Sequence, residues 1–379
     1  MDPSTPPAPG PAGTDAARGP AGGPPAGAAR LVVTGTLPAA DVAHVFALVD
    51  AATVADGVRP LSEHVTLHIR YGGEGPDRNL LLVVPQDGPG PPAAPDAGPG
   101  AAGAAGAVRP GERLAGYAHL DPTDVVAGAA VEIVVHPLMR GQGHGRVLVE
   151  AAAAATPDGR LRLWAHGDTS PARSLAASLG FKEVRRLEQL RRSLWSPLPQ
   201  AQLPAGVTVR AFRPGADDAE WLALNARAFA DHPEQGGWSS ADLAARMRED
   251  WFDPEGFLVA VDDATGAMVA FHWTKIHGGD GHTHGPGGAG EPAGGHAHGH
   301  PHGHAHDPIG EVYVVGVDPA AQGRGLGRAM TLAGLHWLRG RGLPQAMLYV
   351  DADNAPALAV YTALGFTHWD TDVMFSRRG

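Results

Sequence analysis

The sequence VGVDPAAQGRGLGRAM, residues 315–330, joins a valine-rich run to an apolar run of helical character through three glycines in five positions, Gly323, Gly325 and Gly327. A strand, a glycine-rich turn and a helix start, in that order, are typical of phosphate-binding loops. The reason is that the first N–H groups of a helix have no partner within it and carry the positive end of its dipole. Glycines let an anionic group approach these N–H groups closely. The stretch therefore predicts a site for a phosphate-bearing ligand or, as the alternative, a tight turn without one.

The same pattern occurs about half a chain earlier, in IVVHPLMRGQGHGRVL at residues 133–148. Residues 140–146 match 322–328 without a gap, and SLGF at 178–181 matches ALGF at 363–366. Motifs that recur in the same order and spacing indicate an internal repeat. A chain of 379 residues is also long for one domain, so the sequence predicts a tandem duplication of one α/β domain.

Shifts in composition mark the segments around the two copies. Three segments rich in Pro, Gly, Ala or His cannot bury enough apolar surface to offset the entropy of ordering them, and we expect them to be disordered. In chain order the expected organisation is a disordered leader (1–30), an N-terminal domain (31–195) with a disordered insert (about 85–112), a proline-rich link (196–206) and a C-terminal domain (207–379) with a Gly- and His-rich insert (about 278–307).

Overall charge and the lack of cysteine narrow the class of protein. A net charge of −11 argues against nucleic acid or an anionic membrane as the main partner, because both bind basic surfaces. No apolar run is long enough to span a bilayer and no secretory signal is recognisable, so a soluble cytoplasmic protein is expected. Without cysteine there is no disulfide, no thiolate metal ligand and no cysteine nucleophile.

The loop at residues 322–327 reads Gln-x-x-Gly-x-Gly, and its earlier copy at 140–145 reads Arg-x-x-Gly-x-Gly. Neither has the Gly-Lys-Ser/Thr of a Walker loop or the spacing of a dinucleotide fingerprint. Together with the strand before, the helix after and YTALGF at 361–366, the sequence resembles the GCN5-related N-acetyltransferases, whose signature for the acyl-CoA pyrophosphate this is. The resemblance implies two tandem GCN5-related N-acetyltransferase domains, each an α/β (α+β mixed sheet) fold, with acetyl-CoA as co-substrate.

Acetyl transfer to an amine requires groups that the second copy contains. An α-amino group titrates at about pH 7.7–8.0, so a base must take its proton, and the departing CoA thiolate benefits from an acid. Glu311 is the candidate base and Tyr361 the candidate acid, while the backbone near Val317 offers donors for the oxyanion. Alternatively, Glu311 is a solvated carboxylate at the end of a strand, and Tyr361 is an aromatic residue that packs in the core. Ala129 and Ala176 stand at the matching positions of the first copy, so we expect a catalytic C-terminal domain and an N-terminal domain that holds acyl-CoA without turnover.

Longer blocks support a narrower resemblance. They include DGVRPLSEHV (56–65), LWAHGDTSPAR (163–173), FADHPEQGGWS (229–239), WFDPEGF (251–257) and FHWTK (271–275). From about residue 31 onward the chain resembles the mycothiol synthases, tandem acetyltransferases that acetylate the cysteinyl amine of cysteinyl-glucosaminyl-inositol in the last step to mycothiol. The residues that contact the acceptor in that family fall on Glu63, Glu234, Lys275, Glu311 and Tyr349.

The same resemblance implies the acetyl-CoA contacts. In the C-terminal half they fall on Val315, Gly316, Val317, Gln322, Gly323, Arg324, Gly325, Leu326, Gly327, Arg328, Asn354, Ala355, Pro356, Ala357, Leu358 and Ala359. In the N-terminal half they fall on Ile133, Val134, Val135, Gly141, Gln142, Gly143, His144, Gly145 and Arg146.

The implied acceptor carries an amine and many hydroxyls. Carboxylates accept hydrogen bonds from both, and Lys275 can donate to hydroxyls or to a carbonyl. Because Glu63 lies in the first half, the pocket is expected between the two domains of a monomer. Each of these residues also has an alternative in which it does not bind a ligand. Glu63 and Glu234 would then be carboxylates at helix ends, Lys275 a charge at a strand edge, and Tyr349 a core residue. An acidic pocket would also suit an acetyltransferase for another small amine, such as an aminoglycoside or a polyamine.

The second insert contains HAHGHPHGHAH at residues 296–306. Dense neutral imidazoles can bind zinc, nickel or copper, although a low-complexity extension without a specific role is the simpler hypothesis, and we assign no metal ligand. A different class of function would be a metal-buffering protein on an inactive acetyltransferase scaffold. The intact Glu311, Tyr361 and Gln322 motif argue against it.

Overall fold

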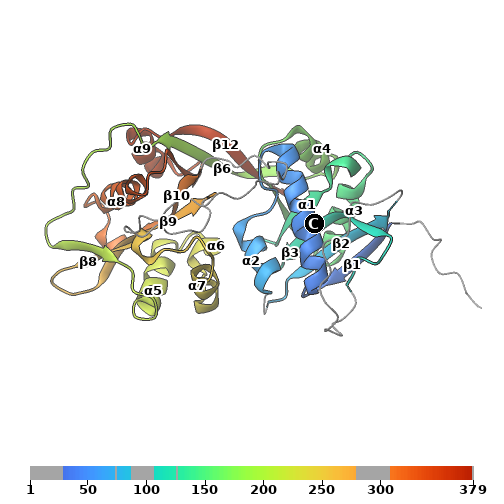
Figure 1. Ribbon diagram of the computed structural model, residues 1–379, viewed down its shortest axis with the longest axis horizontal. Helices are drawn as coiled ribbons and strands as arrows, with labels where there is room; N and C mark the ends of the chain where they lie inside the picture. Colours follow the sequence, from blue (N-terminus) through green and yellow to red (C-terminus); the bar gives the residue numbers. More distant parts are fainter. Residues whose placement is uncertain (1–28, 73–74, 87–105, 125–126, 279–307, 378–379) are drawn as a thin grey trace, which may run out of the picture.

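The computed structural model describes residues 29–72, 75–86, 106–124, 127–278 and 308–377. Residues 1–28 of the predicted leader and most of both predicted inserts lie outside these ranges, whereas Arg30, the last residue of the predicted leader, begins the first strand. Two repeats of similar architecture lie side by side and share one sheet (Figure 1). Within the described ranges no helix has the length and apolar character needed to cross a bilayer.

The first repeat contains six strands and four α-helices among the described residues. In chain order they are β1 (Arg30–Thr34), α1 (Ala39–Asp56), α2 (Glu63–Tyr71), β2 (Arg78–Pro85), β3 (Glu112–Asp121), β4 (Ala129–Val135), α3 (His144–Ala154), β5 (Leu161–Ala165), α4 (Ser170–Ser178) and β6 (Lys182–Ser193). A short 3₁₀ turn, Pro137–Met139, precedes the first glycine-rich loop.

The second repeat follows the same order with one more short helix. Its elements are β7 (Val207–Ala211), α5 (Asp218–Ala228), α6 (Pro233–Gly236), α7 (Ser240–Met247), β8 (Phe257–Asp262), β9 (Met268–His277), β10 (Ile309–Val317), α8 (Leu326–Gly340), β11 (Gln345–Asp351), α9 (Ala355–Ala363) and β12 (Thr367–Arg377). The turn Pro319–Ala321 matches the 3₁₀ turn of the first repeat.

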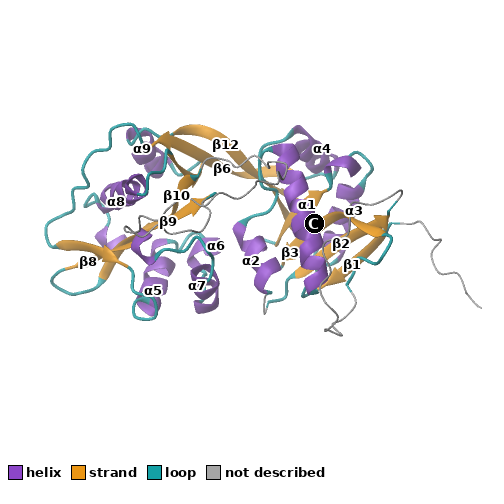
Figure 2. Ribbon diagram, viewed as in Figure 1, coloured by secondary structure: helices purple, strands orange, loops and turns teal. Residues whose placement is uncertain are grey.

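Helices cover both faces of the sheet (Figure 2), and strand alternation explains why. In β2, Leu80 and Leu82 join the core cluster that contains α3, whereas Leu81 and Val83 join the cluster that contains α1 and α2. Successive strand side chains point to opposite faces, so an uninterrupted apolar run has to be covered on both. The repeat is therefore a three-layer arrangement of helices, sheet and helices.

The two repeats exchange their last strands. The sheet order is β1-β2-β3-β4-β5-β12-β6-β11-β10-β9-β8-β7. β12, which closes the second repeat, pairs antiparallel with β5 of the first, and β6, which closes the first, pairs antiparallel with β11 of the second. β6 and β12 also pair with each other, as their crossing between the repeats in Figure 1 shows.

The exchanged strands contribute to the core of the opposite repeat. Val373 and Phe375 of β12 are buried in the cluster formed by β2–β5 and α3, and Leu190 of β6 is buried in the cluster formed by α8, β10 and β11. Arg185 of β6 adds an ion pair to Asp351 of β11, in which its Nε and Nη2 donate to the two carboxylate oxygens at 2.6 and 2.9 Å. Each repeat therefore completes its apolar core with residues of the other.

A buried ionic cluster also joins β12 to the first repeat. His166, which follows β5, lies 3.0 Å from Asp372 of β12 and 3.2 Å from Glu132 of β4. Burial lowers the pKa of His166, but the bonds and charges of Asp372 and Glu132 outweigh it, so that its pKa lies well above the ordinary value. The imidazolium is charged in the folded protein and bridges two carboxylates.

The strand before the glycine-rich loop differs between the repeats by one residue. The register of β10 against β9 shifts at Tyr313, which is extra, whereas β4 pairs with β3 without a shift. When strand partners are counted back from the two glycine-rich loops and Tyr313 is skipped, Glu311 of β10 corresponds to Ala130 of β4. The ungapped sequence alignment matches it to Ala129. Both positions are alanine, so no carboxylate stands at the place of Glu311 in the first repeat.

Residues 106–112, which the predicted disordered insert includes, are instead held by the fold. Asp41 of α1 is fully buried and accepts hydrogen bonds from the N–H groups of Ala107 at 2.7 Å and Val108 at 3.2 Å. Both residues pack against the core cluster of α1. The predicted boundary extends too far because composition does not reveal a buried carboxylate that satisfies this backbone.

Replacing Phe375 by alanine is expected to lower the free energy of unfolding by about 3–5 kcal/mol, because a buried phenylalanine leaves a cavity. The matched control is Trp369→Ala on the same strand, where the ring is 60% exposed and stacks on Arg191, with an expected loss of about 0.5–1 kcal/mol. Urea unfolding measures both. Equal losses would contradict the role of β12 in the core of the first repeat.

The raised pKa of His166 predicts a loss of stability in alkaline solution. A group whose pKa is higher in the folded protein than in the unfolded chain stabilises the folded protein. This contribution is fully present at a pH below the unfolded pKa, about 6.5 for histidine, and it is lost as the pH rises toward the folded pKa. Wild type should therefore lose more stability than His166→Gln between about pH 6 and about pH 10. Urea midpoints across this range measure it, with the exposed His44→Gln as control. Parallel profiles for wild type and His166→Gln would refute the assignment.

Candidate active site

Both glycine-rich turns have the backbone conformation that glycine adopts most readily. Gly323 and Gly325 have φ of 77° and 81°, and Gly141 and Gly143 have φ of 76° and 86° at the matching positions. A Cβ at any of the four would meet no atom within 4 Å, so the left-handed backbone and not crowding requires glycine. Since α8 and α3 each begin after a glycine N-cap without a side chain, their first N–H groups are left for another partner.

The charges beside the two turns differ. Arg140 donates to both oxygens of Asp56 at 2.6 and 2.7 Å, and Arg146 donates to the hydroxyl of Ser178 at 3.0 Å. Arg324 and Arg328 are exposed and form no hydrogen bond or ion pair with the part of the chain that the structure describes. The second turn therefore offers two uncommitted guanidinium groups to an anion, which the first turn does not.

Glu311 lies where two strands separate. β10 and β11 pair in parallel from Ile309 to Glu311 and part beyond it. The buried Oε2 of Glu311 lies 2.6 Å from Nε2 of His277, and because an ionised carboxylate only accepts, that nitrogen carries the proton. Burial raises the pKa of Glu311. The hydrogen bond and charge of His277, together with the charge of Lys275, lower it by more than burial raises it, so the pKa lies below its ordinary value. Glu311 is thus an ionised carboxylate beside a half-buried imidazole.

Glu63, the first residue of α2, reaches from the first repeat to the second. Its carboxylate accepts from the ammonium of Lys275 and from the hydroxyl of Tyr313. Lys275 is buried, lies opposite Glu311 in the β9–β10 register and places its Nζ 4.6 Å from the centre of the Trp251 ring. The two repeats therefore bring Glu63, Lys275 and Glu311 into one polar group between them.

Tyr349 of β11 belongs to the same group. Its hydroxyl accepts a hydrogen bond from Nε2 of Gln189 at 2.6 Å, and its ring is 38% exposed. Burial, with the charges of Asp372 and Glu311, raises the pKa of Tyr349, so the phenol stays neutral. Of the five predicted acceptor contacts, the side chain of Glu234 in α6 lies outside what the structure describes, and the other four come together.

Tyr361 of α9 is half-buried, and its ring lies 5.8 Å from that of Phe366. Its hydroxyl has no hydrogen-bond partner in the described ranges, and burial raises its pKa to about 12. Tyr361 packs against the core cluster that Val315 of β10 also contacts. Asn354 caps α9 by accepting from the N–H of Ala357 at 3.1 Å. The predicted acid is therefore a protonated phenol on the helix that follows β11.

Three side chains of the site were not predicted from the sequence. His277 lies next to the His-rich insert, where its pairing with Glu311 has no local signature. Tyr313 is the extra residue of β10, and Gln189 belongs to the exchanged strand β6. Strand pairing brings His277 to Glu311 and Gln189 to Tyr349, and the packing of α2 against the second repeat brings Tyr313 to Glu63. A single sequence offers no signal for such contacts.

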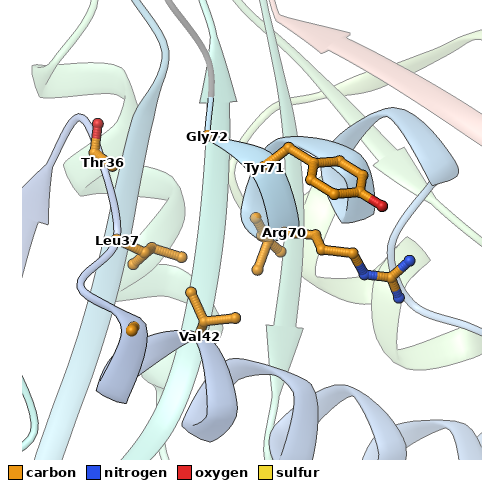
Figure 3. Close-up of a pocket in the computed structure, with 8 residues that line it drawn as sticks. Thr36, Leu37, Val42, Arg70, Tyr71 and Gly72 are labelled. Atoms are coloured by element: carbon orange, nitrogen blue, oxygen red, sulfur yellow. The ribbon is translucent and has the colours of Figure 1, made fainter. Parts of the chain in front are cut away.

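A pocket of about 310 Å³ lies apart from this polar group, between the β1–α1 loop and the end of α2 (Figure 3). Leu37, Val42 and Ile69 give it apolar walls. Beside it, Arg70 and Tyr71 bind Glu249 of the second repeat at 2.5 and 2.7 Å. These bonds are a second contact between α2 and the second repeat, in addition to Glu63.

Comparison with known families agrees with the two repeats. The model of the Acetyltransferase (GNAT) family matches residues 221–366, and that of the Acetyltransferase (GNAT) domain matches residues 105–183. A GCN5-related N-acetyltransferase from Sphaerobacter thermophilus has a similar fold (TM-score 0.57, 22% identity, covering 92% of this chain and 95% of that one). So has a tandem GNAT protein from the clavulanic acid biosynthesis pathway (TM-score 0.59, 19% identity, covering 92% and 98%). The predicted fold of two tandem domains is confirmed.

Relatives align over almost their full length. Mycothiol acetyltransferase of Acidothermus cellulolyticus is 53% identical, covering 92% of this chain and 95% of its own. Enzymes of the same name from Streptosporangium roseum and Thermomonospora curvata are 49% and 46% identical, covering 92% and 91% of this chain and 99% and 96% of their own.

Proposed function

The chain belongs to the mycothiol acetyltransferases, within the GNAT family, and on that premise we propose that it transfers the acetyl group of acetyl-CoA to the cysteinyl amine of cysteinyl-glucosaminyl-inositol, the last step of mycothiol formation. One observation supports the proposal most strongly. An ionised Glu311 at the separation of β10 and β11 lies beside a Lys275–Glu63 pair drawn from both repeats.

The second glycine-rich turn is the proposed acetyl-CoA site. Acetyl-CoA supplies the activated acetyl group, and GNAT enzymes use it in general. The first N–H groups of α8, with the uncommitted Arg324 and Arg328, suit its pyrophosphate. Beyond Glu311, β10 has parted from β11, so the backbone of residues 315–317 faces the space where an acyl carbonyl could accept from it. Residues 354–359 at the start of α9 complete the proposed site.

Two proton transfers complete the proposed reaction. The amine nitrogen attacks the thioester carbon, the carbon–sulfur bond breaks, and the amine proton passes to Glu311, directly or through a water molecule. Tyr361 gives its proton to the departing thiolate, and its high pKa keeps it protonated until that step. The lowered pKa of Glu311 keeps it ready as a base at neutral pH. His277 orients the carboxylate and offers a route for the proton to solvent.

Acceptor recognition would use both repeats. Glu63, Glu234 and Tyr349 offer acceptors for the amine and for sugar hydroxyls, and Lys275 offers a donor. Glu63 and Lys275 bind each other across the repeats, so a bound acceptor would exchange that pair for contacts with its own polar groups. For the first repeat we propose no turnover of its own, because alanines stand at the positions of Glu311 and Tyr361 and its arginines are already paired.

The proposal predicts one product and one essential base. Purified protein given acetyl-CoA and a panel of amines should acetylate the cysteinyl amine of cysteinyl-glucosaminyl-inositol. Mass spectrometry identifies the product, since the acceptor contains a thiol that would mislead thiol-release assays. Glu311→Gln should lower kcat by about 10²–10⁴-fold, because it removes the proton acceptor, whereas the exposed Glu255→Gln should not. Acetylation of a different amine alone would overturn the acceptor, and full activity of Glu311→Gln would overturn the base.

A matched glycine pair tests which turn serves catalysis. Gly325→Ala forces a Cβ into a left-handed backbone at a cost of about 1–2 kcal/mol, so the KM for acetyl-CoA should rise by about tenfold with little change in kcat. Gly143→Ala imposes the same strain on the first turn and should leave both constants unchanged. Steady-state kinetics with acetyl-CoA varied measures both. An equal rise of KM in Gly143→Ala would assign turnover to the first repeat as well.

A further inference from the structure

A cluster of histidine and aspartate side chains lies under α2, away from the proposed active site. His64 and His68 stand one turn apart on α2, Asp77 immediately precedes β2, and His119 belongs to β3. One donor atom each of His64, Asp77 and His119 lies within 4.8 Å of the others. Helix, loop and strand thus bring three possible metal ligands to one point.

Four of the eight side-chain nitrogen and oxygen atoms of this cluster are buried without a hydrogen-bond partner among the described residues. His119 is 2% exposed, and neither of its ring nitrogens has a hydrogen-bond partner among the described residues. Nε2 of His68 and Oδ1 of Asp77 are buried and unpartnered in the same way. Each such atom costs about 1–3 kcal/mol, so four together require a physical explanation.

The donor atoms of the cluster suit a cation. An imidazole offers the lone pair of its unprotonated ring nitrogen to a metal ion, and neither ring nitrogen of His119 is engaged in a hydrogen bond among the described residues. The cluster also contains the carboxylate of Asp77, whose Oδ2 lies 3.0 Å from Nδ1 of His68. His64 is half-exposed and faces Asp121 at 3.9 Å.

We propose that His64, Asp77 and His119 bind a zinc ion, with His68 orienting Asp77 through its hydrogen bond. Two imidazole nitrogens and one carboxylate oxygen suit zinc, whereas calcium and magnesium prefer oxygen ligands alone. A histidine that fixes a ligating carboxylate is a common outer partner of such sites. A fourth coordination position is left for water.

The spacing requires a modest closure. Ligands about 2.0–2.2 Å from zinc in a tetrahedral site lie about 3.4 Å from one another, which is less than the 4.8 Å spread of the cluster. His64 can supply the movement, because its side chain is 51% exposed and it lies in the first turn of α2.

The position of the site gives zinc a defined consequence. His64 directly follows Glu63, the residue that binds Lys275 and Tyr313 across the repeats. Zinc bound at His64 would fasten the first turn of α2 to β3 and thereby fix Glu63 opposite the second repeat. Its role would be to position this residue, and binding itself does not depend on the proposed reaction.

The test must exclude the His-rich insert. The starting protein is the full chain with the eight histidines between 282 and 306 replaced by serine. After equilibrium dialysis with zinc chloride, metal analysis should find one zinc per chain, and zinc at about 100 times its Kd should add about 2.7 kcal/mol to the free energy of unfolding. Bound Co²⁺ should show the intense visible absorption of a low-coordinate site.

Three substitutions in that protein decide the ligand set. His64→Gln, at an exposed position, and the isosteric Asp77→Asn should each weaken zinc binding at least about tenfold and abolish the cobalt absorption. His44→Gln, an exposed histidine of α1, should change neither. Absence of zinc from the starting protein, or equal zinc binding by His64→Gln and His44→Gln, would overturn the site.

Discussion

The exchange of β6 and β12 is the constraint on which the rest of this molecule depends. Each repeat lacks the strand that would complete its own sheet and receives that strand from the other, together with buried side chains such as Phe375 and Leu190. Hydrogen bonds, apolar burial and the His166 cluster all cross at the same place. The relative position of the repeats is therefore fixed by core packing, and a partly buried residue such as Glu63 can be held against Lys275 of the other repeat.

One extra residue in β10 separates the repeats chemically. The shift at Tyr313 allows β10 to keep its pairing with β9 while Tyr313 turns its hydroxyl to Glu63, and no such shift occurs in β4. The first repeat retains the glycine-rich turn but has alanine in place of the carboxylate, and Arg140 is bound to Asp56. Duplication has thus left two copies of one scaffold, of which the second has the carboxylate and, among the described residues, the unpaired arginines that the proposed acetyl transfer would use.

Local features were predictable from the sequence, and pairing across the repeats was not. The glycine-rich turns could be predicted because their left-handed backbone requires glycine at a few positions, and the repeat could be predicted because its motifs recur in the same order. Glu311, Lys275, Glu63 and Tyr349 were named from motif resemblance, and the structure groups them. The strand exchange was missed because β6 and β12 would fit either sheet by pattern alone. The partners His277 and Tyr313, and the anchoring of residues 106–112 by Asp41, depend on contacts between distant segments that periodicity does not encode.

Joining two sheets into one also reduces the number of exposed strand edges. Two separate sheets would present four edges, whereas the described sheet ends only at β1 and β7, which are five residues each. Unpaired edges invite pairing with other chains, and short edge strands limit it. The long apolar strands β2, β3, β9 and β10 all lie in the interior of the order. The fusion of repeats that assembles the site thereby protects the protein from edge-to-edge aggregation.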